Sequence, residues 1–262
     1  MQSIPSQYVS PSSTYFTEVA LGNVPGVTAH ALIGTSSTIP SGSYETVWHD
    51  ASNWIPLITP EFLRVRSGGH IEDVPGGLGT HQIICSCLDA NFMPVDILVS
   101  TDGSNGIDIT TGLPVQMKRI NNAIGFSGGT ARGQNLGDIY LEGDASGTLM
   151  CVLPAGTNRC FMGLATVPAN RKLVAYSFEV LVSSTKAIET RLFASPPPTA
   201  APPYTSRFAV FTTPFITGSL NRLNYSGSSS IDGPLDLEVQ SQLDTGSGGR
   251  VAVSFQWTEH EI

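Results

Sequence analysis

Charged side chains are scarce in this chain. Lys, Arg, Asp and Glu make up 13% of its 262 residues, against about 25% in an ordinary globular protein. This composition excludes a coiled coil, which needs many Glu, Lys and Arg residues. Basic residues are fewer than acidic residues, 13 against 21, which gives a net charge of −8. Because no basic stripe is present and the surface would repel phosphate, we expect no nucleic-acid partner.

Long apolar runs are also missing. No window of 18 apolar residues occurs, so we expect no transmembrane helix and no membrane partner. The first 13 residues are polar and lack the apolar segment of a secretory signal peptide. We therefore expect a protein that either acts in the cytoplasm where it is made or leaves it by cell lysis or inside a particle.

Cysteine is rare, and its spacing fits no metal motif. On a strand, Cys85 and Cys87 share one face and could form half of a zinc site, with Cys151 and Cys160 as the other half. The spacing of nine between Cys151 and Cys160 does not fit a zinc knuckle. We expect free, packed thiols in a reducing compartment, and no metal ion or other cofactor.

Motifs for catalysis are absent from the sequence as well. His49 lies beside Asp50, but a Ser-His-Asp triad is defined by geometry, and no G-x-S-x-G is present. Asp138, Glu142 and Asp144 could supply a glycosidase carboxylate pair. Acids in loops between strands more often cap turns. We therefore predict that the protein is not an enzyme.

Glycine and proline are frequent, at 27 and 18 residues, and they separate short apolar runs. Runs of this kind at intervals of roughly 8–15 residues are typical of a β-sandwich or barrel. Residues 235–240 and 251–257 alternate between apolar and polar, as in strands with one face on a core. The predicted strands are 45–48, 62–65, 82–88, 94–100, 115–120, 138–142, 147–153, 159–165, 172–183, 188–195, 207–213, 235–240 and 250–257.

These patterns predict an all-β fold, an antiparallel β-sandwich with an extended N-terminal arm. We assign residues 1–43 to the arm, because Gly and Pro break every helical period there, and residues 44–262 to the sandwich. Two arrangements of the sandwich region stay open: one interleaved sandwich, or two halves, 44–124 and 138–262, joined by a glycine-rich crossover. Residues 218–233 are rich in Ser, Gly and Asn and are predicted to form one long loop.

Short motifs also occur in a fixed order along residues 15–262. They include EVALGNVPG (18–26), YETVW (44–48), GGLGTHQIIC (76–85), CLDANFMPVD (87–96), NLGDIY (135–140), PAGTN (154–158), LATVPANRK (164–172) and IETRL (188–192). This series resembles a family of virion structural proteins from tailed bacteriophages of the aquatic, cyanobacterial type. Two positions depart from the family pattern, since Cys87 and Asn170 stand where it has glycine.

The resemblance implies a non-enzymatic capsid decoration (cement) protein, with a jelly-roll-like sandwich, that binds and stabilises the outer head shell of the virion. Its implied partners are the major capsid protein and two further copies of itself in a trimer. The residues that we expect to contact the shell belong to the arm: Tyr15, Phe16, Leu21, Val24 and Val27. The alternative for the arm is that it packs on its own sandwich. If the arm binds, deleting about 30 residues should leave a folded protein that no longer binds capsids.

Two other functions remain open at this point. The same family resemblance fits a component of the tail, neck or baseplate, or a head fibre, with tail proteins as partners. A different class is a host-surface carbohydrate-binding module, which would use Trp48, Trp54, Tyr225 and the 218–233 segment.

Overall fold

A computed structural model describes residues 13–50, 52–67, 70–103, 106–108, 115–131, 134–183, 185–198, 208–218, 220–224, 230–246 and 248–262. Within these residues there are seventeen strands and one short helix, and every strand-to-strand pairing is antiparallel. The prediction of an all-β antiparallel fold is confirmed. The predicted strands at 94–100 and 188–195 match β5 and β12 at both ends.

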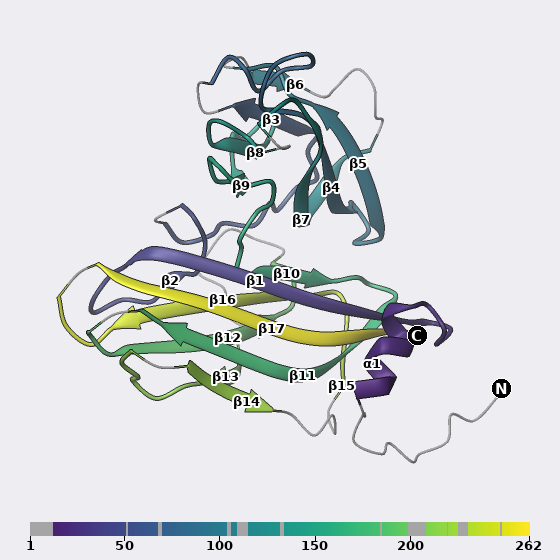
Figure 1. Ribbon diagram of the computed structural model, residues 1–262. Helices are drawn as coiled ribbons and strands as arrows, with labels where there is room; N and C mark the ends of the chain where they lie inside the picture. Colours follow the sequence, from purple (N-terminus) through teal and green to yellow (C-terminus); the bar gives the residue numbers. More distant parts are fainter. Residues whose placement is uncertain are drawn as a thin grey trace.

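The chain packs around two separate hydrophobic cores (Figure 1). The larger core lies in a β-sandwich built from residues 27–47 and 164–262. The smaller core lies in a second unit, residues 48–163, which we call the inserted module because it interrupts the sandwich between β2 and β10. Figure 1 shows the inserted module standing over the edge of the sandwich at which β1 and β10 lie.

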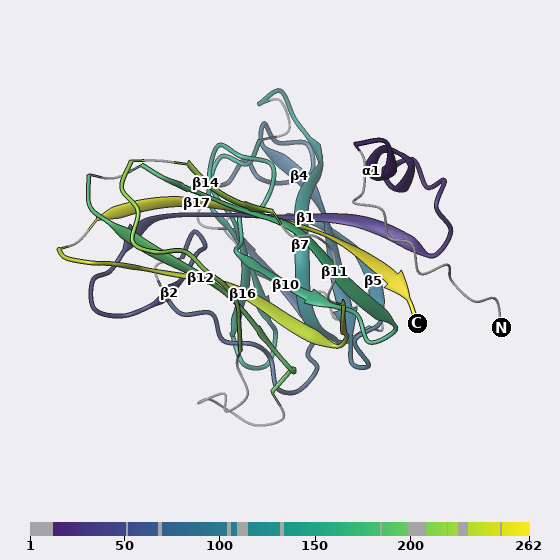
Figure 2. The same cartoon turned by 90° about the horizontal axis from the view of Figure 1, so that it is seen from below.

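Two antiparallel sheets form the sandwich (Figure 2). The first sheet has the order β1 (Val27–Ile39), β17 (Gly249–Glu261), β11 (Arg171–Val182) and β14 (Leu220–Asn224), with β15 (Ser230–Asp232) also paired to β11. The second has the order β10 (Leu164–Val167), β16 (Leu235–Leu243), β12 (Ile188–Ser195) and β13 (Phe208–Thr212), with β2 (Glu45–Thr46) paired to β16. Phe178 and Phe255 of the first sheet meet Phe211 of the second at ring distances of 5.4 and 6.1 Å, so aromatic packing joins the sheets.

The inserted module also has two sheets. One has the order β6 (Gly106–Asp108), β3 (Leu63–Ser67), β8 (Ile139–Gly143) and β9 (Leu149–Leu153), and the other β5 (Pro94–Ser100), β4 (Thr80–Asp89) and β7 (Met117–Gly128). Buried Asp73 organises the loops at one end, because its carboxylate accepts backbone N–H groups of Thr80, Leu136 and Gly137 at 2.9–3.1 Å. One acidic side chain therefore ties the glycine-rich segment after β7 to the chain before β4.

The predicted N-terminal arm is wrong over residues 27–39, which form β1. Backbone pairing with β17 runs from Val27 opposite His260 to Ser36 opposite Val251. The sequence did not predict this strand, because much of it is exposed and carries small or polar residues. Gly34 marks a close approach, since a Cβ there would lie 2.5 Å from the nitrogen of Gly163. Before β1, residues Ser13–Ala20 form the helix α1, which Figure 1 shows near the end of β17.

Two further predictions differ from the structure. The glycine-rich segment 125–137 does not separate two halves, because β8 and β9 follow it and pair in the same sheet as β3. Residues 218–233 are not one loop, because they contain β14 and β15, two short strands that both pair with β11. Both strands are polar and short, so periodicity alone does not distinguish them from a loop.

Candidate functional site

The chain leaves the sandwich at Val47 and returns at Gly163, and these two residues form a narrow neck. The N–H of Gly163 donates to the Val47 carbonyl at 2.6 Å, and the N–H of Val47 donates to Val239 of β16 at 2.9 Å. Val239 in turn donates to the Gly163 carbonyl at 2.7 Å. A Cβ on Gly163 would lie 2.7 Å from the Val47 carbonyl oxygen, so only glycine fits there without a shift.

A buried ion pair locks the inserted module onto the sandwich. Arg119 of β7 donates from Nε and Nη2 to the two carboxylate oxygens of Asp236 of β16, both at 2.8 Å. The side chains are 1% and 4% exposed. Arg119 Nη1 also donates to the carbonyls of Leu57 and Lys118, and Thr166 Oγ1 donates to Asp236 at 2.6 Å. This fork-to-fork geometry fixes orientation as well as distance, because both partners are planar.

Further polar contacts extend the junction on either side. Asn121 of β7 forms a reciprocal pair with Thr166 of β10, donating to its carbonyl and accepting its N–H, both at 2.7 Å. Thr46 Oγ1 accepts the N–H of Trp54 at 2.9 Å and donates to Glu238 at 2.6 Å. The two modules are therefore joined by a neck, an ion pair and side-chain bonds, and a rotation between them would break several at once.

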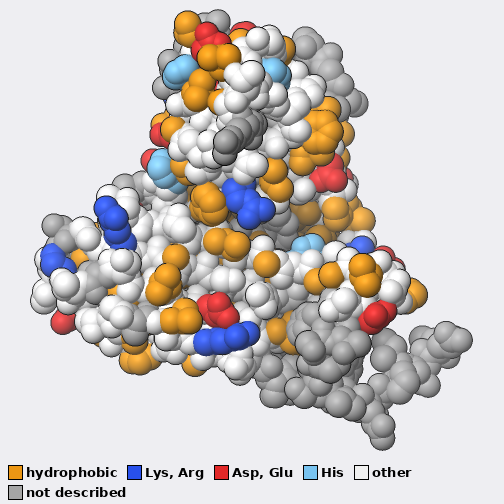
Figure 3. Space-filling view, viewed as in Figure 1, with side chains coloured by type: hydrophobic (Ala, Val, Ile, Leu, Met, Phe, Trp, Pro, Cys, Tyr) orange, Lys and Arg blue, Asp and Glu red, His pale blue; other side chains and the backbone are white. Residues whose placement is uncertain are grey.

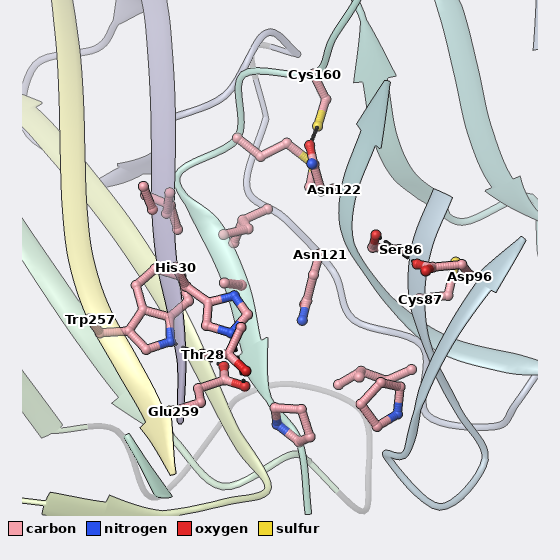
Figure 4. Close-up of a pocket in the computed structure, with 18 of the residues that line it drawn as sticks. Thr28, His30, Ser86, Cys87, Asp96, Asn121, Asn122, Cys160, Trp257 and Glu259 are labelled. Atoms are coloured by element: carbon pink, nitrogen blue, oxygen red, sulfur yellow. Dashed lines mark hydrogen bonds and ion pairs between the residues drawn. The ribbon is translucent and has the colours of Figure 1, made fainter. Parts of the chain in front are cut away.

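Beside this junction lies a cleft of about 450 Å³ between the two modules (Figure 4). Its sandwich wall carries His30, Trp257 and Glu259, and its module wall carries Ser86 and Asp96, which share a hydrogen bond of 2.8 Å. Figure 4 shows Asn121 projecting between the two walls. The cleft runs along the edge strand β1, so it combines backbone, polar and apolar surface.

Burial sets the charge state of the sandwich wall. His30 stacks on Trp257 with ring centroids 5.4 Å apart, and its Nε2 lies 3.4 Å from a Glu259 oxygen. Burial, with a smaller contribution from Arg171, lowers the pKa of His30 to about 4. Burial also raises the pKa of Glu259, although Trp257 Nε1 donates to it at 3.0 Å. At neutral pH His30 is therefore uncharged. Its neutral ring packs on Trp257 and stabilises the end of the sandwich core.

The four cysteines are all free and buried in the inserted module. Cys87 and Cys160 line the cleft, whereas Cys85 and Cys151 do not. Over the described part of the chain, no three His, Cys, Asp or Glu side chains gather in a way that could hold a metal ion. The zinc-site alternative for these cysteines therefore finds no support in the geometry.

The predicted contact residues of the arm do not lie in the cleft. Tyr15 and Phe16 belong to α1, while Leu21 and Val24 follow it and Val27 begins β1. Leu21 is 66% exposed, whereas Val24 and Val27 are half-buried, and the side chain of Phe16 lies outside the described residues. Val19 is buried, so α1 packs on its own protein through one face. Contact with a partner stays a prediction for all five.

The aromatic sugar-binding prediction is wrong for its two tryptophans. Trp48 and Trp54 are 2% and 7% exposed, and Trp48 Nε1 donates to the Ser52 carbonyl at 2.8 Å. They belong to the core of the inserted module because they follow the neck directly. Tyr225 lies outside the described residues.

The candidate catalytic acids have structural partners of their own. Glu142 accepts Arg66 Nη2 at 2.7 Å, and Asp138 accepts the N–H of Ala155 at 2.7 Å. His49 lies 3.6 Å from Asp138 rather than forming a pair with its neighbour in the sequence. The Arg66–Glu142 contact joins the paired strands β3 and β8, and the Asp138 contact holds the turn that follows β9.

Exposed apolar side chains lie on both modules, a feature that the sequence analysis missed (Figure 3). On the sandwich, Ile33, Leu181 and Leu220 are exposed in the sheet that contains β1. On the inserted module, Leu98 is exposed and lies opposite Ile84 of β4. The signal was available in residues 94–100, where apolar residues fall on both faces of the strand.

No helix in the described part of the chain is long and apolar enough to span a membrane. Comparisons with known proteins do not identify a family for the chain. No protein-family model matches the chain, and no curated protein does.

Solved structures of infectious bursal disease virus share low similarity with the chain. The Gx strain structure is 12% identical, with a TM-score of 0.23 over 94% of this chain and 82% of that one. The VP2 subviral particle structure is 12% identical, with a TM-score of 0.22 over 90% of this chain and 76% of that one. The T13 viral particle structure is 12% identical, with a TM-score of 0.24 over 89% of this chain and 73% of that one. TM-scores this low support neither a shared fold nor a shared function.

Proposed function

We propose that this chain is a non-enzymatic virion structural protein, a capsid decoration (cement) protein that binds the outer head shell of a tailed bacteriophage. The observation that carries the proposal is the buried Arg119–Asp236 pair, which makes one rigid body of two β-modules. A protein that clamps neighbouring shell subunits works by resisting displacement. Its binding surfaces must therefore keep a fixed distance and angle under load.

The positions of the family-like motifs support this proposal. The motif at 44–48 contains β2 and enters the neck at Val47, and the motif at 164–172 contains β10 and the turn into β11. The motif at 135–140 begins at Asn135, which is buried and donates to the carbonyls of Gly137, Leu153 and Pro154. The resemblance therefore falls on positions that determine the junction and the loop geometry, where a shared architecture would constrain sequence most.

In this proposal the arm binds the major capsid protein, and three copies of the chain assemble at a local three-fold position of the head. The arm is here α1 and the turn that follows it, through Tyr15, Phe16, Leu21, Val24 and Val27. Leu21 is the best exposed of the described side chains in this set. It stands at the end of α1, directly before Gly22, whose φ of +75° turns the chain toward β1.

Copy number in purified virions tests the proposal. Quantitative mass spectrometry, normalised to the major capsid protein, should give a number of the same order as the capsid protein, because closed symmetry ties abundance to equivalent sites. A count of about 3 to 18 would move the protein to the tail, neck, baseplate or a head fibre. Absence from the virion would overturn both assignments.

A further inference from the structure

Arg250 is an exposed cation of the sandwich that has no acidic partner. It lies at the start of β17 and forms no ion pair with any residue that the structure describes. Five other arginines each pair with a carboxylate: Arg66, Arg119, Arg171, Arg191 and Arg222. An unpaired arginine on a protein with a net charge of −8 can attract an anion from outside the molecule.

A β-bulge places two side chains of β1 opposite Arg250. The pairing of β1 with β17 is regular up to Ser36 and resumes at Ile39. Ser37 and Thr38 therefore both lie opposite the single residue Arg250, where the end of β1 runs beside the start of β17 (Figure 1). Bulges turn side chains away from their regular positions and are over-represented beside functional sites.

A serine also flanks Arg250 on its other side. Ser183, directly after β11, donates its backbone N–H to the Arg250 carbonyl at 3.1 Å. Residues directly opposite each other on neighbouring strands have Cβ atoms about 4.5–5.5 Å apart. Arg250 therefore lies between serines of both neighbouring segments, close enough for one small ligand to contact all three side chains.

These side chains line a pocket of about 300 Å³ beside the first sandwich sheet. Leu181 and Ala252 supply apolar surface, and of the described residues that line the pocket none is acidic. Four lining residues carry hydroxyl groups: Thr35, Ser36, Ser37 and Ser183. The pocket therefore combines one cation with several neutral hydrogen-bond donors.

His49 adds an imidazole from the inserted module to this pocket. Its Nε2 lies 3.6 Å from Asp138, which does not line the pocket, so this carboxylate offsets any charge on the imidazole. Arg250 is therefore the source of the positive charge that a ligand meets.

We propose that this pocket binds a phosphate or sulfate group, held by the Arg250 guanidinium and by the surrounding hydroxyls. A guanidinium presents a planar fork of N–H donors that matches two oxygens of such a group. Serine and threonine hydroxyls can donate to the remaining oxygens. The volume of about 300 Å³ lies at the lower end of the range for small-molecule sites, which leaves room for an attached group such as one sugar ring. The inference does not depend on the proposed function, because it requires no contact with a capsid.

Isothermal titration calorimetry of the native full-length chain tests the site. The probes are inorganic phosphate, inorganic sulfate, glucose 6-phosphate and glucose 6-sulfate, all at constant ionic strength. We expect saturable binding of at least one probe, with a dissociation constant in the millimolar range or below. Tighter binding of a glucose ester than of its free ion would assign the ligand as a sugar-borne group, and equal binding would assign it as the free ion. Both results support the site, whereas no saturable binding of any probe would overturn it.

Variants identify the residues that hold the anion. Arg250→Gln should weaken binding about tenfold or more, because it removes the charge and the fork of donors. Ser183→Ala should weaken it less, because it removes one neutral hydrogen bond. Arg159→Gln is the matched control, since Arg159 is also exposed and forms no ion pair with the described residues but lies outside this pocket. Equal losses in Arg250→Gln and Arg159→Gln would contradict the proposal.

Chemical modification of the unmutated protein keeps the test valid if a variant fails to fold. Phenylglyoxal reacts with accessible arginines, and peptide mapping locates the modified side chains. Saturating phosphate should slow the modification of Arg250 and leave that of Arg159 unchanged. Protection of both arginines, or of neither, would count against the site.

Discussion

At the scale of single residues, Asp236 is the carboxylate on which the rigidity of the molecule depends. Asp236→Asn should lower the free energy of unfolding by about 3–5 kcal/mol, because it leaves the Arg119 charge buried without compensation. Urea unfolding followed by circular dichroism measures the change. Asp232→Asn is the control, since Asp232 is 68% exposed and its ion pair with Lys172 is worth under about 1 kcal/mol. Equal losses in the two variants would contradict this role.

His30 should make stability depend on pH. Its pKa of about 4 in the folded protein lies below its ordinary value of 6.5, so the unfolded chain binds more protons between these values. The free energy of unfolding should therefore fall as the pH drops from about 6.5 to 4. Below about pH 4, His30 should cause no further decrease. His30→Gln removes the contribution, so thermal melts of the variant should vary less across this window. Parallel melting curves for both proteins would show that another group is responsible.

The sequence alone could not reveal that Asp236 pairs with Arg119 or that His30 is buried. Arg119 and Asp236 are 117 positions apart, and each stands in a strand where an isolated charge suggests a solvated face. His30 stood in a segment without clear periodicity. Their environments arise only from the packing of the module on the sandwich. The burial of the four thiols was predictable, because a free cysteine packs as a small apolar side chain.

At the scale of elements, β1 decides where the N-terminal segment can be cut. Removing residues 1–25 should leave the fold intact and reduce capsid binding, because β1 keeps its full pairing with β17. Removing residues 1–39 should unfold the sandwich, since β17 then loses its outer neighbour and Leu32 and Ile39 leave the core. Thermal melts and co-sedimentation with capsids lacking the protein measure the two effects. The original estimate of about 30 residues would have cut into β1.

Leu21→Glu gives a finer form of the same experiment. A charge at this exposed position should weaken co-sedimentation with capsids about tenfold or more and leave the melting temperature unchanged. Leu78→Glu, at a comparably exposed leucine of the inserted module, serves as the control and should bind normally. Normal binding by Leu21→Glu would remove the arm from the contact.

Strands that alternate or are strongly apolar were predictable, and the polar strands at sheet edges were not. β5, β12 and β16 alternate or are strongly apolar, and their positions were predicted closely. β1, β14 and β15 carry small or polar residues because they lie at the margins of their sheet. Their strand character comes from pairing with β17 and β11, which periodicity within a short window does not contain.

At the scale of the whole molecule, the insertion architecture predicts that the sandwich survives without its module. Replacing residues 49–162 by a short glycine turn should leave a folded sandwich, because Val47 and Gly163 are already hydrogen-bonded at 2.6 Å. Without the module Asp236 would face water, so the loss of Arg119 as its partner would cost little free energy of folding. Circular dichroism and a cooperative thermal transition measure this outcome. A chain that fails to fold would show that the junction, rather than the sandwich core, stabilises the larger unit.

The placement of the module was beyond sequence reasoning for a physical reason. Glycine-rich segment 125–137 suggested a crossover, yet it begins inside β7, and Asp73 holds Leu136 and Gly137 within the same unit. The true boundary lies at two residues more than a hundred positions apart, Val47 and Gly163, which have no composition signal. The cleft follows from that boundary, so it was equally hidden.

The pairing of β1 with β17 also bears on how the protein is made. Residues 40–248 separate the two strands, and ribosomes add about 5–20 residues per second, so β1 waits roughly 10–40 s for its partner. The inserted module is contiguous in residues 48–163 and has no such delay. During synthesis it is therefore the first part able to complete its core, while β1 remains an unpaired strand that a second nascent chain could capture.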